Sequence, residues 1–170
     1  MTDFVPQTIA ILTVSDSRTL EDDRSGDYLV EALEQGGHNL GARQLVPDDR
    51  YRIRAVLSAW IAAPDIAVII MTGGTGPTGR DISLAAVRPL LDKELAGFGE
   101  LFRQLSAAEV GTSAILSDAA AGIANGTVVF VLPGSPGACR TAWEQIIRTQ
   151  LDTHTRPCSL ADLMPRLNER

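Results

Sequence analysis

The chain has 170 residues, a formal charge of −6 at neutral pH and 45% hydrophobic residues. This length fits one domain, residues 1–170, that can bury roughly 70% of the surface of its unfolded chain. The negative charge argues against nucleic acid as a partner, because proteins that bind nucleic acid need a basic face. No window reaches the roughly 18 apolar residues of a membrane span, and no secretory signal opens the chain. We therefore expect a cytoplasmic protein that does not contact membranes.

Apolar segments alternate with helical patterns in the first half of the chain. Residues 8–14 are typical of a strand, and Ser25 is the expected N-cap of a helix that closes at Gly36-Gly37. A second, weaker strand is expected over residues 39–46. Residues 51–62 carry apolar side chains at helical spacing and form the clearest amphipathic helix of the chain.

The short apolar run of residues 66–71 suits a strand buried on both faces of a parallel sheet. It opens directly into a loop, residues 72–81, that is rich in glycine and threonine. Such a loop lets backbone N–H groups close on an anion, which side chains would otherwise prevent. It is not a Walker A loop, and its match to the dinucleotide fingerprint is weak because it contains Pro77 and follows the third strand. The loop predicts a site for a phosphorylated ligand.

The second half of the chain continues the alternation. Another buried strand is expected over residues 127–132, and a loop of small residues, 133–137, follows it. The tail, 152–170, is polar and contains two prolines, so we expect it to be irregular or extended. One helix is expected to begin with a cap at Ser83 and to end at Leu90 or Leu91. Two further helices are expected over residues 97–108 and 138–150, and one or two short helical turns within residues 114–124.

This order of elements predicts an α/β fold, a three-layer sandwich with helices on both faces of a mostly parallel sheet. In such sheets the loops at the carboxyl ends of the strands share one edge, and ligands bind there. The loops expected at this edge are rich in small, polar or acidic residues. Segments that are distant in the sequence should therefore converge on one pocket there. They are residues 15–18, 47–49, 72–81 and 133–137.

Asp48 and Asp81 follow two of these strands. Taken singly, Asp81 could be a helix N-cap and Asp48 a turn residue. Two carboxylates facing a polyphosphate would repel it unless Mg²⁺ lay between them. Arg80 can neutralise a phosphate, although most arginines are solvated or ion-paired.

Five segments of the chain are distinctive: TVSDS (13–17), DRSG (23–26), MTGGTGPTGRD (71–81), GFGELFRQLS (97–106) and LPGSPGACRTAWEQII (132–147). Together they resemble the MoaB/MogA family of molybdenum-cofactor biosynthesis proteins, to which the gephyrin G and plant Cnx G domains belong. The likeness runs from about residue 8 to 158. The combination of TGGTG, the following RD and PGxP is highly specific, and the C-terminal segment is similar to the MoaB branch.

The resemblance implies a molybdopterin-binding protein that assembles as a trimer or, in the MoaB branch, a hexamer. Adenylylating members transfer AMP from MgATP to the terminal phosphate of molybdopterin, release pyrophosphate and serve a molybdenum-insertion step. Two acidic residues are required for catalysis in that family. They correspond to Asp48 and Asp81, which would also hold the Mg²⁺. The implied binding residues are Ser15, Asp16, Ser17, Thr72, Gly73, Gly74, Thr75, Gly76, Arg80, Pro133, Gly134, Ser135 and Pro136.

The chain departs from the family pattern at Gly137, where many relatives carry a lysine that could contact phosphate. The MoaB branch also varies at the first acidic position, but this chain keeps Asp48, which favours an active adenylyltransferase. The alternative is a protein that binds molybdopterin or its precursor without chemistry. A third possibility is a nucleotide pyrophosphatase, because the same domain occurs in competence-damage-like proteins.

Overall fold

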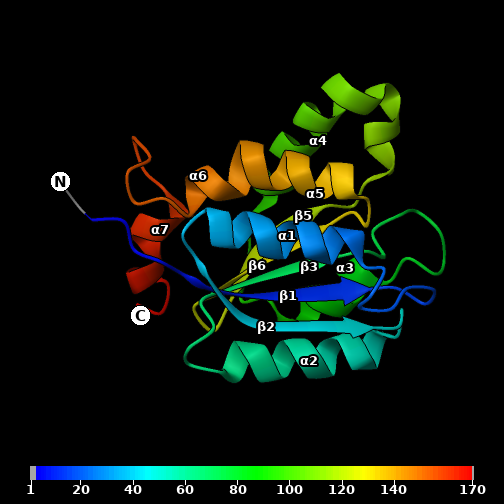
Figure 1. Cartoon of the computed structure of the whole chain (residues 1–170), viewed down its shortest axis with the longest axis horizontal. Helices are drawn as coiled ribbons and strands as arrows, with labels where there is room; N and C mark the ends of the chain where they lie inside the picture. Colours follow the sequence, from blue (N-terminus) through cyan, green and yellow to red (C-terminus); the bar gives the residue numbers. More distant parts are fainter. Residues whose placement is uncertain (1–2, 170) are drawn as a thin grey trace.

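A computed structural model describes residues 3–169 and has a six-stranded sheet at its centre (Figure 1). The strand order is β2-β1-β3-β6-β5-β4. The first four of these strands are parallel, and β5 and β4 run antiparallel at the far edge. The strands are β1 (Thr8–Val14), β2 (Asn39–Val46), β3 (Val68–Thr72), β4 (Lys93–Glu94), β5 (Ala120–Ala124) and β6 (Thr127–Leu132).

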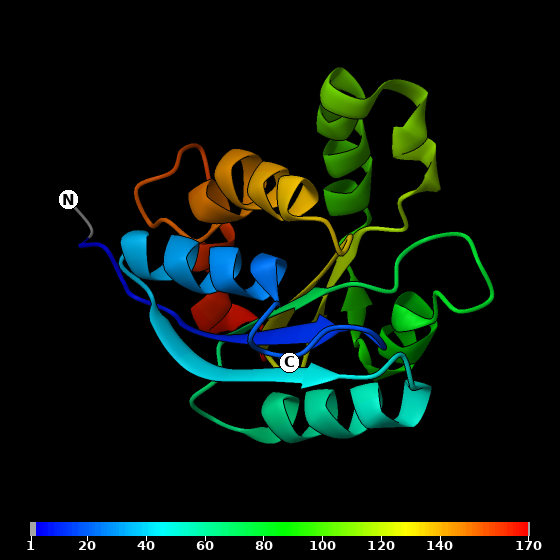
Figure 2. The same ribbon diagram turned by 45° about the vertical axis from the view of Figure 1, so that its right-hand side comes forward.

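Helices cover both faces of the sheet, which confirms the predicted three-layer sandwich (Figures 1 and 2). One face carries α1 (Arg24–Gln35), α4 (Ala96–Val110) and a continuous helical segment made of α5 (Pro136–Ala142), a π-helical turn (Trp143–Ile147) and α6 (Arg148–Gln150). The other face carries α2 (Arg50–Ala62) and α3 (Ser83–Val87). Short 3₁₀ turns follow α3 (Arg88–Leu90), α4 (Gly111–Leu116) and α7 (Met164–Arg166). No helix of the described residues is long and apolar enough to cross a membrane.

The buried strands send alternate side chains into two separate cores. In β3, Val68 and Ile70 pack toward α1, whereas Ile69 and Met71 pack toward α2. All four side chains are fully buried, as expected for a parallel strand covered on both faces. Trp143 is 1% exposed and fills the core under the π-helical turn, so it is a core residue.

Two of the predicted helix starts are wrong. Asp23, not Ser25, caps α1, because its Oδ1 atom accepts a hydrogen bond of 2.9 Å from the Gly26 N–H. Ser83 does not cap α3, whose N-cap is Ile82 without a side-chain bond. The Ser25 hydroxyl instead donates to Gly134 O, and the Ser83 hydroxyl donates to Gly73 O in the loop that precedes α3.

The helical turns predicted within 114–124 are half wrong. The 3₁₀ turn Gly111–Leu116 is present, but Ala120–Ala124 forms β5, which pairs with β6. Alanine favours helix locally, and pairing with a buried strand overrides that preference. The tail also differs from the irregular prediction, since it contains a one-turn helix, α7 (Leu160–Leu163).

Candidate functional site

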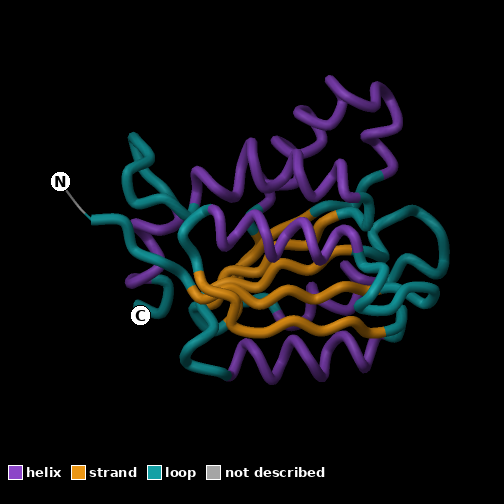
Figure 3. The backbone as a smooth tube through the Cα atoms, in the orientation of Figure 1, coloured by secondary structure: helices purple, strands orange, loops and turns teal. Residues whose placement is uncertain are grey.

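The loops at the carboxyl ends of the parallel strands lie together at one edge of the sheet, as predicted (Figure 3). Hydrogen bonds tie them to each other. The Ser15 N–H donates to Val46 O over 3.0 Å, and the Gly73 N–H donates to Leu132 O over 3.0 Å. The Asp48 N–H donates to Asp16 Oδ1 over 2.9 Å. These bonds join the ends of β1 and β2 to each other and the ends of β3 and β6 to each other.

A cavity of about 350 Å³ lies between the loop after β3 and the loop after β6. Both loops reach it through residues that the sequence had predicted. The cavity also has a third wall, which sequence reasoning missed, from the turn that follows α4. The lining residues are Gly74, Thr75, Gly76 and Asp81, then Pro133, Gly134 and Ser135, and from the third wall Ser113, Leu116 and Ser117.

Glycine is required where the two loops touch. Gly73 has a φ of +104°, and a Cβ atom there would overlap the Val14 carbonyl oxygen. A Cβ on Gly134 would stand 3.2 Å from the Gly73 Cα. The loops therefore meet backbone to backbone, and their peptide groups rather than side chains face the space between them.

Asp81 borders the cavity with an ionised carboxylate. Its Oδ2 accepts hydrogen bonds from the Thr78 hydroxyl at 2.6 Å and the Thr78 N–H at 3.0 Å. The hydroxyl bond is the main cause that holds the pKa of Asp81 below its ordinary value. A Cβ on Gly76 would stand 2.6 Å from the same oxygen, so the carboxylate lies against the glycine loop. Asp81 is not the N-cap of α3, and its carboxylate instead closes the turn from Thr78 to Asp81.

Asp48 lies beside the same loop with an unpartnered oxygen. Its Oδ1 atom is buried and has no hydrogen-bond partner among the described residues. A Cβ on Gly74 would stand 3.3 Å from this atom. Burial raises the pKa of Asp48, and the negative charges of Asp16 and Asp81 raise it further. Asp49, not Asp48, caps α2 by accepting bonds from two N–H groups at 2.9 and 2.8 Å.

This pair of carboxylates fits a divalent cation. An orphaned, buried carboxylate oxygen near a second carboxylate is an unfavourable arrangement that a cation would relieve. The described residues contain no group of three or more His, Cys, Asp or Glu side chains placed to hold a metal ion. Mg²⁺ bound through one or two carboxylates and completed by substrate phosphates needs no more than Asp48 and Asp81.

The other predicted residues, Asp48 among them, do not line the cavity. Arg80 is 80% exposed on the rim, and its Nη2 pairs with Asp16 Oδ2 at 2.6 Å. Ser15 closes its own turn by accepting bonds from the N–H groups of Ser17 and Arg18. Thr72 is fully buried and donates to Pro133 O at 2.8 Å, so its hydroxyl faces away from the cavity. Pro136 begins α5 and is not part of the lining.

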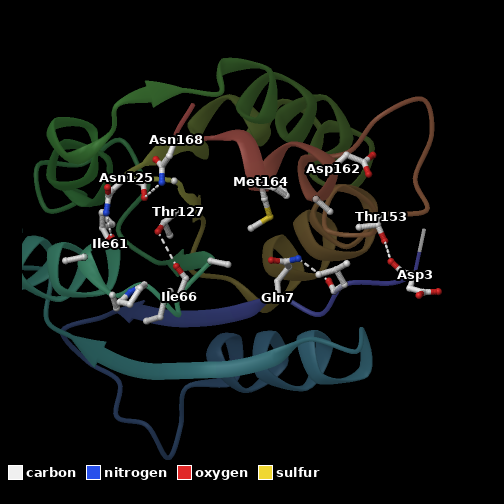
Figure 4. Close-up of a pocket in the computed structure, with 18 residues that line it drawn as sticks. Asp3, Gln7, Ile61, Ile66, Asn125, Thr127, Thr153, Asp162, Met164 and Asn168 are labelled. Atoms are coloured by element: carbon white, nitrogen blue, oxygen red, sulfur yellow. Dashed lines mark hydrogen bonds between the residues drawn. The ribbon is translucent and has the colours of Figure 1, made fainter. Parts of the chain in front are cut away.

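A larger cavity, of about 800 Å³, lies at the other end of the strands, where β1 and β6 begin (Figure 4). It is bounded by the starts of β1 and β6, the end of α2 and the tail. Its charged lining residues are Asp3 and Asp162, and no lysine or arginine contributes. None of the predicted site residues lines this cavity, whereas Asp81 and both predicted loops line the smaller one, so the smaller cavity is the candidate site.

Residues 10–153 match the family model described as “Probable molybdopterin binding domain”. The chain belongs to this family, and the predicted MoaB/MogA membership is confirmed. It is therefore a member of a family of molybdenum cofactor biosynthesis proteins.

Among its relatives is “Molybdenum cofactor biosynthesis protein B” of Escherichia coli (strain K12), which is 53% identical over 93% of each chain. A crystal structure of a molybdenum cofactor biosynthesis protein B matches at 44% identity, with a TM-score of 0.82 over 85% of this chain and 91% of the other. The tungsten cofactor synthesizing protein MoaB from Pyrococcus furiosus matches at 38% identity, with a TM-score of 0.75 over 83% of this chain and 90% of the other. These likenesses place the chain in the MoaB branch.

Proposed function

We propose that the protein binds molybdopterin and transfers AMP to it from MgATP, giving adenylyl-molybdopterin and pyrophosphate. The observation that carries this proposal is the unpartnered Asp48 Oδ1, which lies beside the glycine loop and close enough to Asp81 for the two charges to interact. A purely structural turn would not retain such an unfavourable group.

The chemistry asks little of the protein beyond alignment and charge neutralisation. The terminal phosphate of molybdopterin is already an anion, so no general base is needed for one of its oxygens to attack the α-phosphorus of ATP. The new phosphorus–oxygen bond forms as the bond from the α-phosphorus to the bridging oxygen breaks, and pyrophosphate leaves with that oxygen. N–H groups of the two loops would hold the phosphates in line. A Mg²⁺ ion held by Asp48 and Asp81 would supply positive charge to the transferred group.

The test is AMP transfer from MgATP to purified molybdopterin, followed through adenylylated pterin and pyrophosphate. Asp81→Asn should lower turnover at least about 100-fold, because it removes half of the metal-binding charge. It should leave molybdopterin affinity within a few fold. Asp65→Asn is the matched control, since Asp65 is exposed between α2 and β3 and should behave like the wild type. Unchanged turnover in Asp81→Asn would contradict the proposed role.

A binding protein without chemistry is the second candidate. No lysine or arginine lines the candidate cavity, Arg80 is paired with Asp16, and Gly137 supplies no charge. Tight molybdopterin binding by the wild type with no adenylylated product would establish this role. Hydrolysis of ADP-ribose would instead indicate a nucleotide pyrophosphatase.

We also propose that the protein works as a homo-oligomer, a hexamer or a trimer, and passes its product to a molybdenum-insertion protein. The proposal rests on the family resemblance. It is supported by exposed apolar side chains at the end of α4 and in the turn that follows, where Val110, Ile115 and Leu116 are 55%, 79% and 54% exposed.

A further inference from the structure

Three buried hydroxyl groups lie just outside the candidate cavity and hold the loops that form it. Ser25, Thr72 and Ser83 are at most 4% exposed and are absent from the cavity lining. We infer that these three residues are positioning residues, which fix the direction of the loop peptides so that the cavity presents N–H groups to an anion. The inference rests on the proposed function only in placing a phosphorylated ligand in this cavity.

Each hydroxyl donates to one loop carbonyl. Ser83 Oγ donates to Gly73 O over 2.7 Å. Thr72 Oγ1 donates to Pro133 O over 2.8 Å, and Ser25 Oγ donates to Gly134 O over 2.8 Å. The donors come from α3, β3 and α1, so three separate elements hold the two loops in place.

Backbone groups complete the pattern. The Ser83 N–H donates to Gly74 O at 3.0 Å, and the Asp118 N–H donates to Thr75 O at 3.0 Å. The Cys139 N–H donates to Ser135 O at 3.1 Å. Every carbonyl oxygen of residues 73–75 and 133–135 therefore accepts a hydrogen bond from within the protein.

The opposite ends of the same peptide groups are free. Among residues 3–169, the N–H groups of Gly74, Thr75, Gly134 and Ser135 donate no hydrogen bond. All four residues line the 350 Å³ cavity. The C=O and N–H of a planar trans peptide point in opposite directions, so a carbonyl held inward turns its N–H outward. Three of these four peptides are fixed by the three hydroxyls and the fourth by the Ser83 N–H.

This orientation needs to be enforced, because glycine peptides can turn over at little steric cost. A turned peptide would aim a carbonyl oxygen at the phosphate and repel it. The hydroxyls thus control the sign of the potential in a site that no lysine or arginine lines.

The test measures affinity for inorganic pyrophosphate, with Mg²⁺ present, by isothermal titration calorimetry. Thr72→Val removes the hydroxyl and keeps the shape of the side chain, and Thr72→Ser restores the donor. Thr127→Val is the matched control, because the Thr127 hydroxyl makes a similar buried bond to Ile66 O, 3.2 Å long, at the other edge of the sheet (Figure 4). We expect Thr72→Val to bind roughly three- to tenfold more weakly, Thr72→Ser to recover most of that affinity, and Thr127→Val to stay within about twofold of the wild type.

Ser25→Ala and Ser83→Ala extend the test to the other two donors and should weaken binding by similar factors. In the wild type, pyrophosphate should shift the amide NMR signals of Gly74, Thr75, Gly134 and Ser135. Equal affinity of folded Thr72→Val and wild type would overturn the inference, as would an equal loss in Thr127→Val or a wild type that does not bind pyrophosphate. Hydroxyl-dependent pyrophosphate binding without AMP transfer would support the inference while rejecting the adenylyltransferase.

Discussion

Asp48 is a residue at which the requirements of the proposed function and of stability oppose each other. Its Oδ1 atom is buried without a hydrogen-bond partner among the described residues, and the charges of Asp16 and Asp81 lie nearby. Such a carboxylate costs folding free energy unless a cation neutralises it. Unfavourable local features of this kind are expected at functional sites.

The Asp48→Asn variant should therefore be more stable than the wild type in the absence of Mg²⁺. Because the folded pKa of Asp48 lies above its ordinary value of 3.8, the native state holds this proton more tightly than the unfolded state. Its contribution to the free energy of unfolding falls as pH rises from about 3.8 through the raised pKa. Calorimetry at pH 7 should show a Tm about 1–3 °C higher for Asp48→Asn, and the difference should vanish near pH 3. A lower Tm at pH 7 would show that the carboxylate has a stabilising partner.

The glycines of the loop after β3 should differ sharply in their tolerance of alanine. Gly73→Ala should lower the free energy of unfolding by about 2–4 kcal/mol, because φ is positive there and a Cβ would overlap the Val14 carbonyl. Gly79→Ala is the control, since a Cβ at Gly79 meets no atom within 4 Å. Urea titration should leave the control within about 0.5 kcal/mol of the wild type. Similar losses in both variants would contradict the close contact of the loops.

The positions of some of these residues near the cavity can be predicted from the sequence, and those of others cannot. Asp81 and the glycines of residues 73–76 form a motif within one short segment, so their proximity to the cavity could be predicted. The direction of the Thr72 hydroxyl could not, because it depends on a carbonyl that is 61 residues away. Ser113 and Ser117 were missed because only the packing of α4 brings their segment to the loops, and no local spacing indicates it.

The start of α1 shows the limit of prediction for a single element. Asp23 and Ser25 are both good N-cap residues, and local pattern cannot choose between them. Partners distant in sequence make the choice. Asp23 is fully buried, where it accepts a bond from the Thr13 hydroxyl at 2.7 Å and pairs with Arg43 at 3.1 Å. Strand β5 was missed for a related reason, since its alanines form a strand only through pairing with β6.

Asp23→Ala should lower the free energy of unfolding by about 3 kcal/mol or more. The change leaves Arg43 beside a buried gap and removes the cap of α1. Asp27→Ala is the matched control, because Asp27 pairs with the same arginine at 2.8 Å but its side chain is 57% exposed. Denaturant unfolding should show a loss of at most about 1 kcal/mol for the control. Equal losses would mean that burial of Asp23 is not what matters.

At the scale of the whole molecule, the strand order places a switch point between β1 and β3, and the candidate cavity lies one strand further, between the loops after β3 and β6. β1 pairs with β2 on one side and β3 on the other, so the chain leaves β1 in one direction and later returns to its other side. Ligands bind at the carboxyl edge beside such a switch point. This architecture could be predicted because strands and helices alternate clearly along the first half of the chain. The antiparallel β4 and β5 could not, since β4 has only two residues.

Sedimentation velocity at micromolar concentration should show a hexamer, or a trimer, rather than a monomer. Ile115→Ser should shift the distribution toward smaller species, because Ile115 is the most exposed of the apolar residues in its segment. Tyr51→Ser is the control, since Tyr51 is 72% exposed on α2. A stable monomer of the wild type would count against the assembly that the family resemblance implies.

The hydrogen bond from Ser25 to Gly134 joins residues 109 apart in the chain. During synthesis, therefore, Asp48 and Asp81 leave the ribosome well before the second half of the candidate cavity exists. A nascent chain cannot bind its ligand, and only finished molecules gain from it. A ligand present at 100 times its dissociation constant adds about 2.7 kcal/mol to native stability. Where degradation follows the unfolded population, that gain would slow the loss of finished molecules roughly 100-fold, so substrate supply would set how long the protein persists.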